Sequence, residues 1–464
     1  MSRRQIGFGS RIHGCTLALL SLLCSGLVAS AQADIYADIT SQPTAPVTPA
    51  YFGVHFHRLA PLPAEHVAAT AWPDLSFGSV RLWDAGTAWR DIAPRGGVWD
   101  FSRVETVQQM AAAHNADVLL TLGSTPQWAS SRPDEPCPYG KGCAAEPVRL
   151  AHWDEYVRRT AAHFGTRITA YEVWNEPFFS DVTRDRGQTG FYTGSIANMV
   201  EMTRSARRIL REVAPHATLC SPGFVNGPDR LEYFLAAGGA AEIQAVCYHF
   251  YAENSDHFAE QIKAVRSIMA RQGIAHLPLW NTETGVETQA PSEPYSSISA
   301  RSEPEATARL SQMLVLGAAA GLAHFYYYAY DNGRSGLIDR NGRPLPGWDT
   351  MRRLQNAMLG LQFTGCNRTA ALVLCHAVPA ATAASTADAA PTGHSASGST
   401  LHYVFAWSRS NQDSVQAPLP VPPGSQALAL EPLRGDASDL SALARVATRP
   451  FVFGPMPVRI AYAP

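Results

Sequence analysis

Between residues 51 and 330, eight short apolar runs alternate with longer amphipathic segments, and this alternation is the feature that most limits the possible folds. The short runs are rich in β-branched and aromatic residues, whereas the segments between them repeat apolar residues every three or four positions. Strands that alternate with helices form parallel sheets covered by helices. Eight such units in about 280 residues fit a closed barrel. We therefore predict an α/β fold, a (β/α)8 TIM barrel.

The predicted strands and helices follow one another along the chain. The strands are 51–57, 79–84, 117–123, 168–176, 217–223, 245–251, 278–285 and 324–330. The helices between them include 102–114, 151–164, 190–213, 258–271 and 304–321. An open doubly wound sheet is the alternative, but no G-x-G-x-x-G follows the first strand and six strands would suffice for it.

The sequence changes character near residue 345. A helical pattern at 348–361 is followed by strand-like runs at 370–376, 401–408, 426–430 and 458–462. Residues 377–400 are rich in Ala, Ser and Thr without periodicity, which is typical of a mobile loop. We predict a barrel domain over 34–345 and a helix plus small C-terminal β-sandwich over 346–464. Residues 34–50, and 34–40 in particular, are candidates to join that sandwich.

The first 33 residues have the pattern of a secretory signal peptide. Arg3, Arg4 and Arg11 precede an apolar run at 15–29, and Ala31-Gln32-Ala33 fits a cleavage site. We expect cleavage after Ala33 and a secreted or periplasmic protein. The other long apolar run, 313–330, contains two glycines and a histidine, so we expect a buried helix and strand there and no membrane span.

Six cysteines lie outside the predicted signal peptide, and export would permit disulfides. They comprise Cys137 and Cys143 in a Pro/Gly loop, Cys366 and Cys375 around a candidate hairpin, and Cys220 and Cys247 in strand-like runs. Each local pair is a plausible bridge, while the last two residues fit either buried thiols or a third bridge. Neither local pair has C-x-x-C spacing or a neighbouring histidine pair, and we expect no metal or other cofactor.

Two glutamates are the strongest candidates for chemistry because each ends a predicted barrel strand. Glu176 ends the fourth strand in YEVWNEPF, and Glu283 ends the seventh in LWNTETG. Active sites of these barrels are built at that rim. Strands four and seven lie on opposite sides of the mouth, so the carboxylates can face each other across a bound sugar. For either glutamate by itself, a helix cap or a rim salt bridge is the alternative.

These motifs resemble those of a known clan of enzymes. WNEP at 174–177 and NTE at 281–283 are similar to the catalytic signatures of retaining glycosidases with (β/α)8 barrels, in which two glutamates end strands four and seven. Arg81 in SVRLWD, and His249 and Tyr251 in CYHFY, match further positions of that clan. Within it, the YFGVHFHR opening, STPQWAS and the trailing sandwich look most like glycoside hydrolase family 39.

The resemblance implies Glu176 as acid/base and Glu283 as nucleophile. The neighbouring residues suit these roles. Asn175 would hydrogen-bond the sugar 2-hydroxyl, Arg81 would keep Glu283 ionised and Tyr251 would donate its hydroxyl to Glu283. His249 would tune Glu176 or bind sugar, with a hydrogen-bonded core histidine as the alternative.

Sugar sites also require aromatic faces, because the C–H faces of pyranoses pack on them. Trp128, after the third strand, is our candidate platform. Alternation along strand eight places Tyr328 on one face together with Tyr326 and Tyr330. His55 and His57, at the end of the first strand, are candidates to reach the sugar.

Composition and motifs exclude other classes. With 37 Lys+Arg against 39 Asp+Glu, the net charge of -2 lacks the basic field that nucleic-acid binding requires. No P-loop or H-E-x-x-H is present, and GHSAS lacks the last glycine of a nucleophile elbow. We predict an exported retaining glycoside hydrolase acting on plant or bacterial poly- or oligosaccharides. The alternative is a non-catalytic carbohydrate-binding protein on such a barrel. Sugar identity, endo or exo cleavage and oligomeric state stay open.

Overall fold

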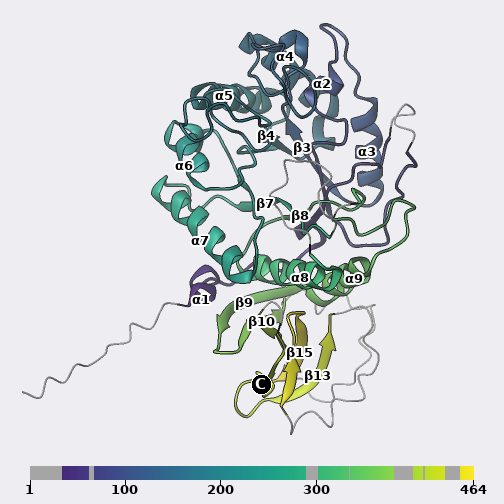
Figure 1. Ribbon diagram of the computed structural model, residues 1–464, viewed down its shortest axis with the longest axis vertical. Helices are drawn as coiled ribbons and strands as arrows, with labels where there is room; N and C mark the ends of the chain where they lie inside the picture. Colours follow the sequence, from purple (N-terminus) through teal and green to yellow (C-terminus); the bar gives the residue numbers. More distant parts are fainter. Residues whose placement is uncertain are drawn as a thin grey trace, which may run out of the picture. The chain divides into compact units, whose positions relative to one another are not determined.

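The computed structural model describes residues 34–61, 67–288, 301–333, 335–380, 401–410, 413–433 and 450–464. The predicted signal peptide and residues 381–400 of the predicted loop lie outside these ranges. Within them, parallel strands form one sheet in the order β5-β4-β3-β2-β1-β8-β7-β6. Parallel bridges from Cys220 to Ala245 and from Phe224 to Tyr248 join its two ends. The sheet therefore closes, and the predicted (β/α)8 barrel is confirmed (Figure 1).

Each barrel strand lies inside its predicted run but is shorter than that run. The strands are β1 Phe52–Val54, β2 Ser79–Leu82, β3 Asp117–Leu122, β4 Ala170–Val173, β5 Thr218–Cys220, β6 Val246–His249, β7 Leu279–Thr284 and β8 Phe325–Tyr327. The last residues of most runs leave the sheet and enter the loops at the mouth, where they are free to serve a site instead of the ladder of hydrogen bonds.

Helices follow the strands and cover the barrel, as Figure 1 shows. They are α2 Trp89–Ile92, α3 Ser102–Ala113, α4 Leu150–Phe164, α5 Ile196–Val213, α6 Asp229–Ala236, α7 Ser255–Arg271 and α8 Glu303–Ala319, with short 3-10 turns at Pro49–Tyr51, Gln127–Ala129, Gly165–Arg167 and Gly239–Ala241. Local sequence fixes their starts: the Ser195 side chain caps α5 by accepting from the Asn198 amide at 3.1 Å. Our sequence analysis missed α6, whose eight residues are too few for a clear period.

The barrel interior changes character along the strands. Its lower part is one apolar cluster of Leu119, Ala170, Cys220, Ala245, Cys247, Trp280 and Tyr326. We call this cluster the floor. Gly53 leaves room for it, since a Cβ there would lie 2.4 Å from the Tyr326 ring. Two positions further along their strands, Leu119, Ala170 and Cys247 are succeeded by Thr121, Glu172 and His249, all buried. The next layer is therefore polar and charged.

The C-terminal part forms the predicted β-sandwich. A five-stranded antiparallel sheet has the order β13-β15-β11-β10-β9, and β12 pairs with β14. It follows α9 Pro346–Met358 and consists of β9 Leu361–Arg368, β10 Leu372–Pro379, β11 His402–Ser408, β12 Val415–Ala417, β13 Gln426–Pro432, β14 Phe451–Phe453 and β15 Val458–Ala463. Its own apolar core includes Val404, Ile460 and Phe453.

Residues 34–40 contain a short helix and join β9 through side chains, since the amides of Arg368 and Cys366 donate to Asp34 and Thr40, both at 2.7 Å. Helix α1, Ile35–Ile39, is capped by Asp34, whose side chain accepts from the Tyr36 amide at 3.1 Å. Tyr36 and Ile39 are both buried and lie three residues apart, a helical spacing that the short segment did not make obvious. Backbone pairing with the sandwich begins later: the amides of Thr44 and Val47 donate to carbonyls of β9 at 3.1 and 2.8 Å.

The described residues include all six cysteines whose pairing was considered above. Cys137 pairs with Cys143 and Cys366 with Cys375, so both local disulfides are confirmed. Cys220 and Cys247 are buried free thiols of the floor. The apolar run 313–330 forms the end of α8 and strand β8, as expected. Across the described ranges, no helix combines the length and hydropathy needed to cross a bilayer.

Candidate active site

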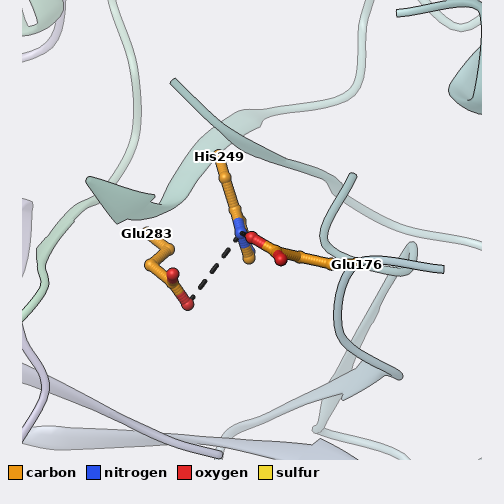
Figure 2. Close-up of side chains that lie close together, drawn as sticks. All are labelled: Glu176, His249 and Glu283. Atoms are coloured by element: carbon orange, nitrogen blue, oxygen red, sulfur yellow. Dashed lines mark hydrogen bonds and ion pairs between the residues drawn. The ribbon is translucent and has the colours of Figure 1, made fainter. Parts of the chain in front are cut away.

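Glu176 and Glu283 face each other at the mouth of the barrel. Figure 2 shows both carboxylates directed toward the imidazole of His249. One oxygen of each carboxylate and one ring nitrogen of His249 all lie within 4.8 Å of one another. Glu283 belongs to β7, whereas Glu176 lies three residues beyond the end of β4 and does not end that strand as predicted. The structure thus brings together two acids that are 107 positions apart in sequence, from strands four and seven.

A tight local turn carries Glu176 to this position. Trp174 and Glu176 have φ angles of 74° and 41°, in the left-handed region that side chains usually avoid. The Trp174 indole donates to the carbonyl of Phe191 at 2.6 Å, and the Glu176 amide donates to the carbonyl of Gly223 at 2.8 Å. Such backbone costs about 1–3 kcal/mol per residue and persists where surrounding contacts hold it, often at active sites.

Arg81 lies below the mouth and hydrogen-bonds to Glu283, Asn175 and Glu172. Its side chain is fully buried, and its Nη1 donates to Glu283 Oε2 at 2.9 Å while its Nη2 donates to Asn175 Oδ1 at 2.6 Å. Its Nε donates to Glu172 Oε2 at 2.7 Å. The cation therefore holds the candidate nucleophile on one side and the residue beside the candidate acid on the other.

Glu172 is a further buried acid of the site that was not predicted from the sequence. It is completely buried in β4, where it accepts from Arg81 and from the Thr121 hydroxyl at 2.8 Å. The available signal was an acid in an otherwise apolar strand, AYEV, which is costly without a buried cation. Glu172 thus holds Arg81 in place from below.

Two residues at the end of β6 approach the glutamates directly. The Tyr251 hydroxyl donates to Glu283 Oε1 at 2.8 Å, as predicted. His249 Nδ1 lies 2.8 Å from Glu176 Oε1 and 3.9 Å from Glu283 Oε2. Burial lowers the pKa of His249 to about 4, so its ring is neutral at pH 7. Glu283 is therefore held through both of its oxygens, and Glu176 through one.

Burial is the main influence on the pKa values of both candidate catalytic acids. It raises the pKa of Glu176 to about 7, against the attraction of Arg81 and Arg230. Burial also raises the pKa of Glu283, and the negative charge of Glu176 adds to this, while Arg81 opposes it. Because like charges this close resist joint ionisation, the pair shares protons as one unit near neutral pH. Arg81 and Tyr251 favour placing the charge on Glu283.

The same Glu176, His249 and Glu283 trio contains residue types that bind metals. A cation there would face the Arg81 guanidinium, whose Nη1 lies 2.9 Å from Glu283 Oε2. That repulsion disfavours a metal, and the hydrogen bonds of the site already account for its arrangement.

A second polar cluster lies beside the first strands. Asp84, just after β2, accepts from His57 at 3.0 Å and from the Tyr328 hydroxyl at 2.5 Å, both at Oδ2. Asp331 accepts from the backbone amide of His57 at 2.8 Å. Burial opposes charge on His57, but these two carboxylates outweigh it and raise its pKa to about 10. The sequence predicted His57 and Tyr328 as site residues, and it missed Asp84 and Asp331, whose partners are distant in the chain.

The remaining predicted residues are placed differently. His55 is buried, with Nε2 3.0 Å from the carbonyl of Thr282 and its ring edge-on to that of Tyr328. The Trp128 indole donates to the carbonyl of Ala93 at 2.8 Å. Its ring packs against Trp89 and His152, on α2 and α4. These contacts give Trp128 a packing role and do not bring it among the residues that surround the glutamates.

The chain is similar in sequence to a characterised glycosidase over part of its length. It is 23% identical over 213 residues to a β-xylosidase from Geobacillus stearothermophilus, a match that covers 40% of each protein. The match thus spans two fifths of that relative. No family model matches the chain.

Solved structures extend the likeness over most of the chain. A family 39 glycoside hydrolase from Bacteroides cellulosilyticus WH2 superimposes with a TM-score of 0.61 at 15% identity, covering 90% of this chain and 82% of that one. A family 30 endoxylanase from Clostridium papyrosolvens C71 gives a TM-score of 0.55 at 11% identity, covering 92% and 98%. The fold is that of the barrel glycoside hydrolases with a C-terminal β-sandwich. The resemblance to barrel glycoside hydrolases indicated by the motifs is confirmed, and a family 39 enzyme is among the similar structures.

Proposed function

We propose that this protein is an exported retaining glycoside hydrolase, with Glu176 as acid/base and Glu283 as nucleophile. The observation that carries the proposal is the separation of their carboxylate oxygens, which is within 4.8 Å. Retaining enzymes place the two carboxyl groups about 5–5.5 Å apart, whereas inverting enzymes need about 6.5–9.5 Å to admit a water. The short separation therefore favours direct attack on the sugar.

The first step forms a glycosyl ester. A carboxylate oxygen of Glu283 attacks the anomeric carbon, and the bond from that carbon to the glycosidic oxygen breaks. The bonding electrons go to the leaving oxygen, which takes the proton of Glu176. A pKa of about 7 keeps much of Glu176 protonated at neutral pH. Asn175, whose Oδ1 accepts from Arg81, would hydrogen-bond the 2-hydroxyl of the sugar.

The second step releases the sugar with its original configuration. Glu176, now a carboxylate, takes a proton from water, whose oxygen attacks the anomeric carbon. Glu283 leaves as a carboxylate, and the hydrogen bonds from Arg81 and Tyr251 stabilise the charge that returns to it. While Glu283 is esterified its charge is absent, which lowers the pKa of Glu176 and suits it to act as a base.

The relatives suggest which substrates to test first. The sequence relative is a β-xylosidase, and the family 30 neighbour is an endoxylanase. We therefore propose a β-linked, xylose-containing poly- or oligosaccharide as the substrate class. Export is proposed on the predicted signal peptide, and the two disulfides of the described residues suit an oxidising compartment.

A panel of 4-nitrophenyl glycosides, followed by NMR of the first-formed product, tests the proposal. We expect hydrolysis of at least one β-glycoside with retention of configuration, and loss of activity in Glu283→Ala. An inverted product would rule out Glu283 as a nucleophile. Binding of xylo-oligosaccharides without hydrolysis of any panel member would instead support a carbohydrate-binding protein.

A further inference from the structure

The loop between β3 and α4 is closed by the Cys137–Cys143 disulfide. The loop is also fixed at its base: the Gly142 amide donates to the Glu135 carbonyl at 2.8 Å, and the Ser130 hydroxyl donates to the Gly142 carbonyl at 2.9 Å. The Thr125 amide, just beyond β3, donates to the Cys143 carbonyl at 3.1 Å. The loop is therefore tied to the rim of the barrel.

This loop carries Tyr139 into an aromatic group. The Tyr139 ring stacks on Phe191 with centroids 5.6 Å apart and meets Trp83 edge-on at 5.7 Å. Trp83 also meets Phe191 edge-on at 6.0 Å. The three residues come from the loops that follow β2, β3 and β4. We call this group, Trp83, Tyr139 and Phe191, the aromatic wall.

The aromatic wall borders the candidate active site. The carbonyl of Phe191 accepts from the Trp174 indole, two residues before Glu176. Trp83 is followed directly by Asp84, and Trp83, Asp84 and Tyr139 line one cavity of about 190 Å³. Burial raises the pKa of Tyr139 well above its usual value, and the charges of Asp84, Glu283 and Glu176 add to this. Tyr139 therefore lies within electrostatic reach of all three acids.

Asp84 suits sugar recognition at this place. Its Oδ2 is engaged by His57 and Tyr328, and although burial opposes charge on it, the charged His57 holds the pKa of Asp84 well below its usual range. An ionised carboxylate beside aromatic rings offers a pyranose both a hydroxyl acceptor and apolar faces.

We propose that the aromatic wall and Asp84 form a sugar-binding subsite of this active site, in which Tyr139 packs against the pyranose and the Cys137–Cys143 disulfide positions Tyr139. The proposal rests on the proposed function, because it places the subsite next to Glu176 and Glu283. Tyr139 is a binding residue in this account, and the disulfide acts only through it.

Four variants test the subsite: Tyr139→Ala, Tyr139→Phe, the double change Cys137→Ser/Cys143→Ser, and Cys366→Ser/Cys375→Ser as the matched control in the sandwich. The readouts are KM and kcat on the best substrate of the nitrophenyl panel, and the Kd of xylobiose from tryptophan fluorescence. Thermal unfolding of each variant separates binding from stability.

We expect Tyr139→Ala to raise KM and Kd about tenfold, because a ring contact is lost, and Tyr139→Phe to change them by about twofold or less. The Cys137→Ser/Cys143→Ser variant should raise them in the same direction, and the sandwich control should not. An unchanged Kd in Tyr139→Ala, or an equal rise in both disulfide variants, would overturn the proposal. Tyr139-dependent binding of xylobiose without any hydrolysis would leave the subsite standing and refute the proposed function, whereas a wild type that does not bind xylobiose would overturn the subsite.

Discussion

The floor and the mouth of the barrel are built on the same strands, yet they differ in almost every physical respect. On β4, Ala170 belongs to the apolar floor and Glu172 to the charged layer above it. On β6, Cys247 and His249 make the same change two residues apart. Residues two positions apart on one strand therefore differ in the polarity of their side chains.

The comparison between the floor and the mouth shows in which layer of the barrel charged side chains are buried. Most of the floor needs no polar partners, because Leu119, the alanines and the two thiols pack as apolar groups. Above it, Arg81 is buried only because Glu172, Glu283 and Asn175 all accept from it. Buried charges cost several kcal/mol unless they are paired. Their concentration at the rim marks the part of the barrel to which we assign the chemistry.

The largest expected effect is at the mouth. Glu283→Ala should lower kcat by roughly 10⁴-fold or more, because the nucleophile is lost. The matched change in the floor, Cys220→Ala, should leave kcat within about twofold and cost about 1 kcal/mol of stability. Steady-state kinetics and thermal unfolding of both variants provide the check. Equal losses of activity would remove the functional distinction between the two layers.

Glu176→Ala should lower turnover by about 10²- to 10⁴-fold on substrates with poor leaving groups. The loss should be smaller with 2,4-dinitrophenyl glycosides, whose leaving group needs no proton. Added azide should restore turnover and yield a glycosyl azide of retained configuration. An azide product of inverted configuration, or equal losses on both substrates, would contradict the acid/base role.

The pH profile follows from the raised pKa of Glu176. Its proton is needed for the first step, so kcat/KM on a poor leaving group should fall tenfold per pH unit above about pH 7. The sign is set by the acid form: activity is present below the pKa and lost above it. In Glu176→Gln this alkaline limb should disappear. A limb that persists unchanged in that variant would assign it to another group.

Arg81→Met tests the charged layer through stability. The change leaves Glu172 and Glu283 buried without their cation, and we expect a loss of about 3–5 kcal/mol. Denaturant unfolding measures it. The double variant Arg81→Met/Glu172→Gln should recover part of the lost free energy of unfolding. If the losses of the two single variants simply add in the double variant, the two residues do not interact.

The smallest effect is expected where the floor is tightest. Gly53→Ala would place a Cβ 2.4 Å from the Tyr326 ring, and overpacking of this kind costs about 1–3 kcal/mol. Gly96 is a matched control, because a Cβ there meets Trp128 at an ordinary 3.6 Å. Thermal unfolding of the two variants should separate them. Equal stability would indicate that the floor can relax.

Sequence periodicity predicted the barrel because each strand position alternates with a helical segment, and the motifs predicted Glu176, Glu283 and Arg81. The sequence assigned the two glutamates to the ends of strands four and seven, although Glu176 lies in a turn beyond β4. The prediction failed where the cause lies in distant contacts. Asp84 owes its place to His57 and Tyr328, and Tyr139 owes its place to a disulfide and two other loops.

Short or displaced segments explain the other failures. Residues 34–40 contain too few apolar positions for their sequence to predict the single helical turn of α1. Trp128 is an aromatic residue of the kind that packs on sugars. Its indole, however, donates to the carbonyl of Ala93 and its ring packs on Trp89. Which surface an aromatic ring covers depends on loop geometry, which spacing along the chain does not encode.

The central claim is that Glu283 attacks the sugar from across the mouth of the barrel. Incubation with a 2-deoxy-2-fluoro glycoside of the sugar preferred in the panel, followed by peptide mass spectrometry, tests it most directly. We predict one added fluoroglycosyl group on the peptide that contains Glu283, and none in Glu283→Ala. Labelling at another residue, or turnover of the panel substrate by an enzyme that the reagent never labels, would contradict it.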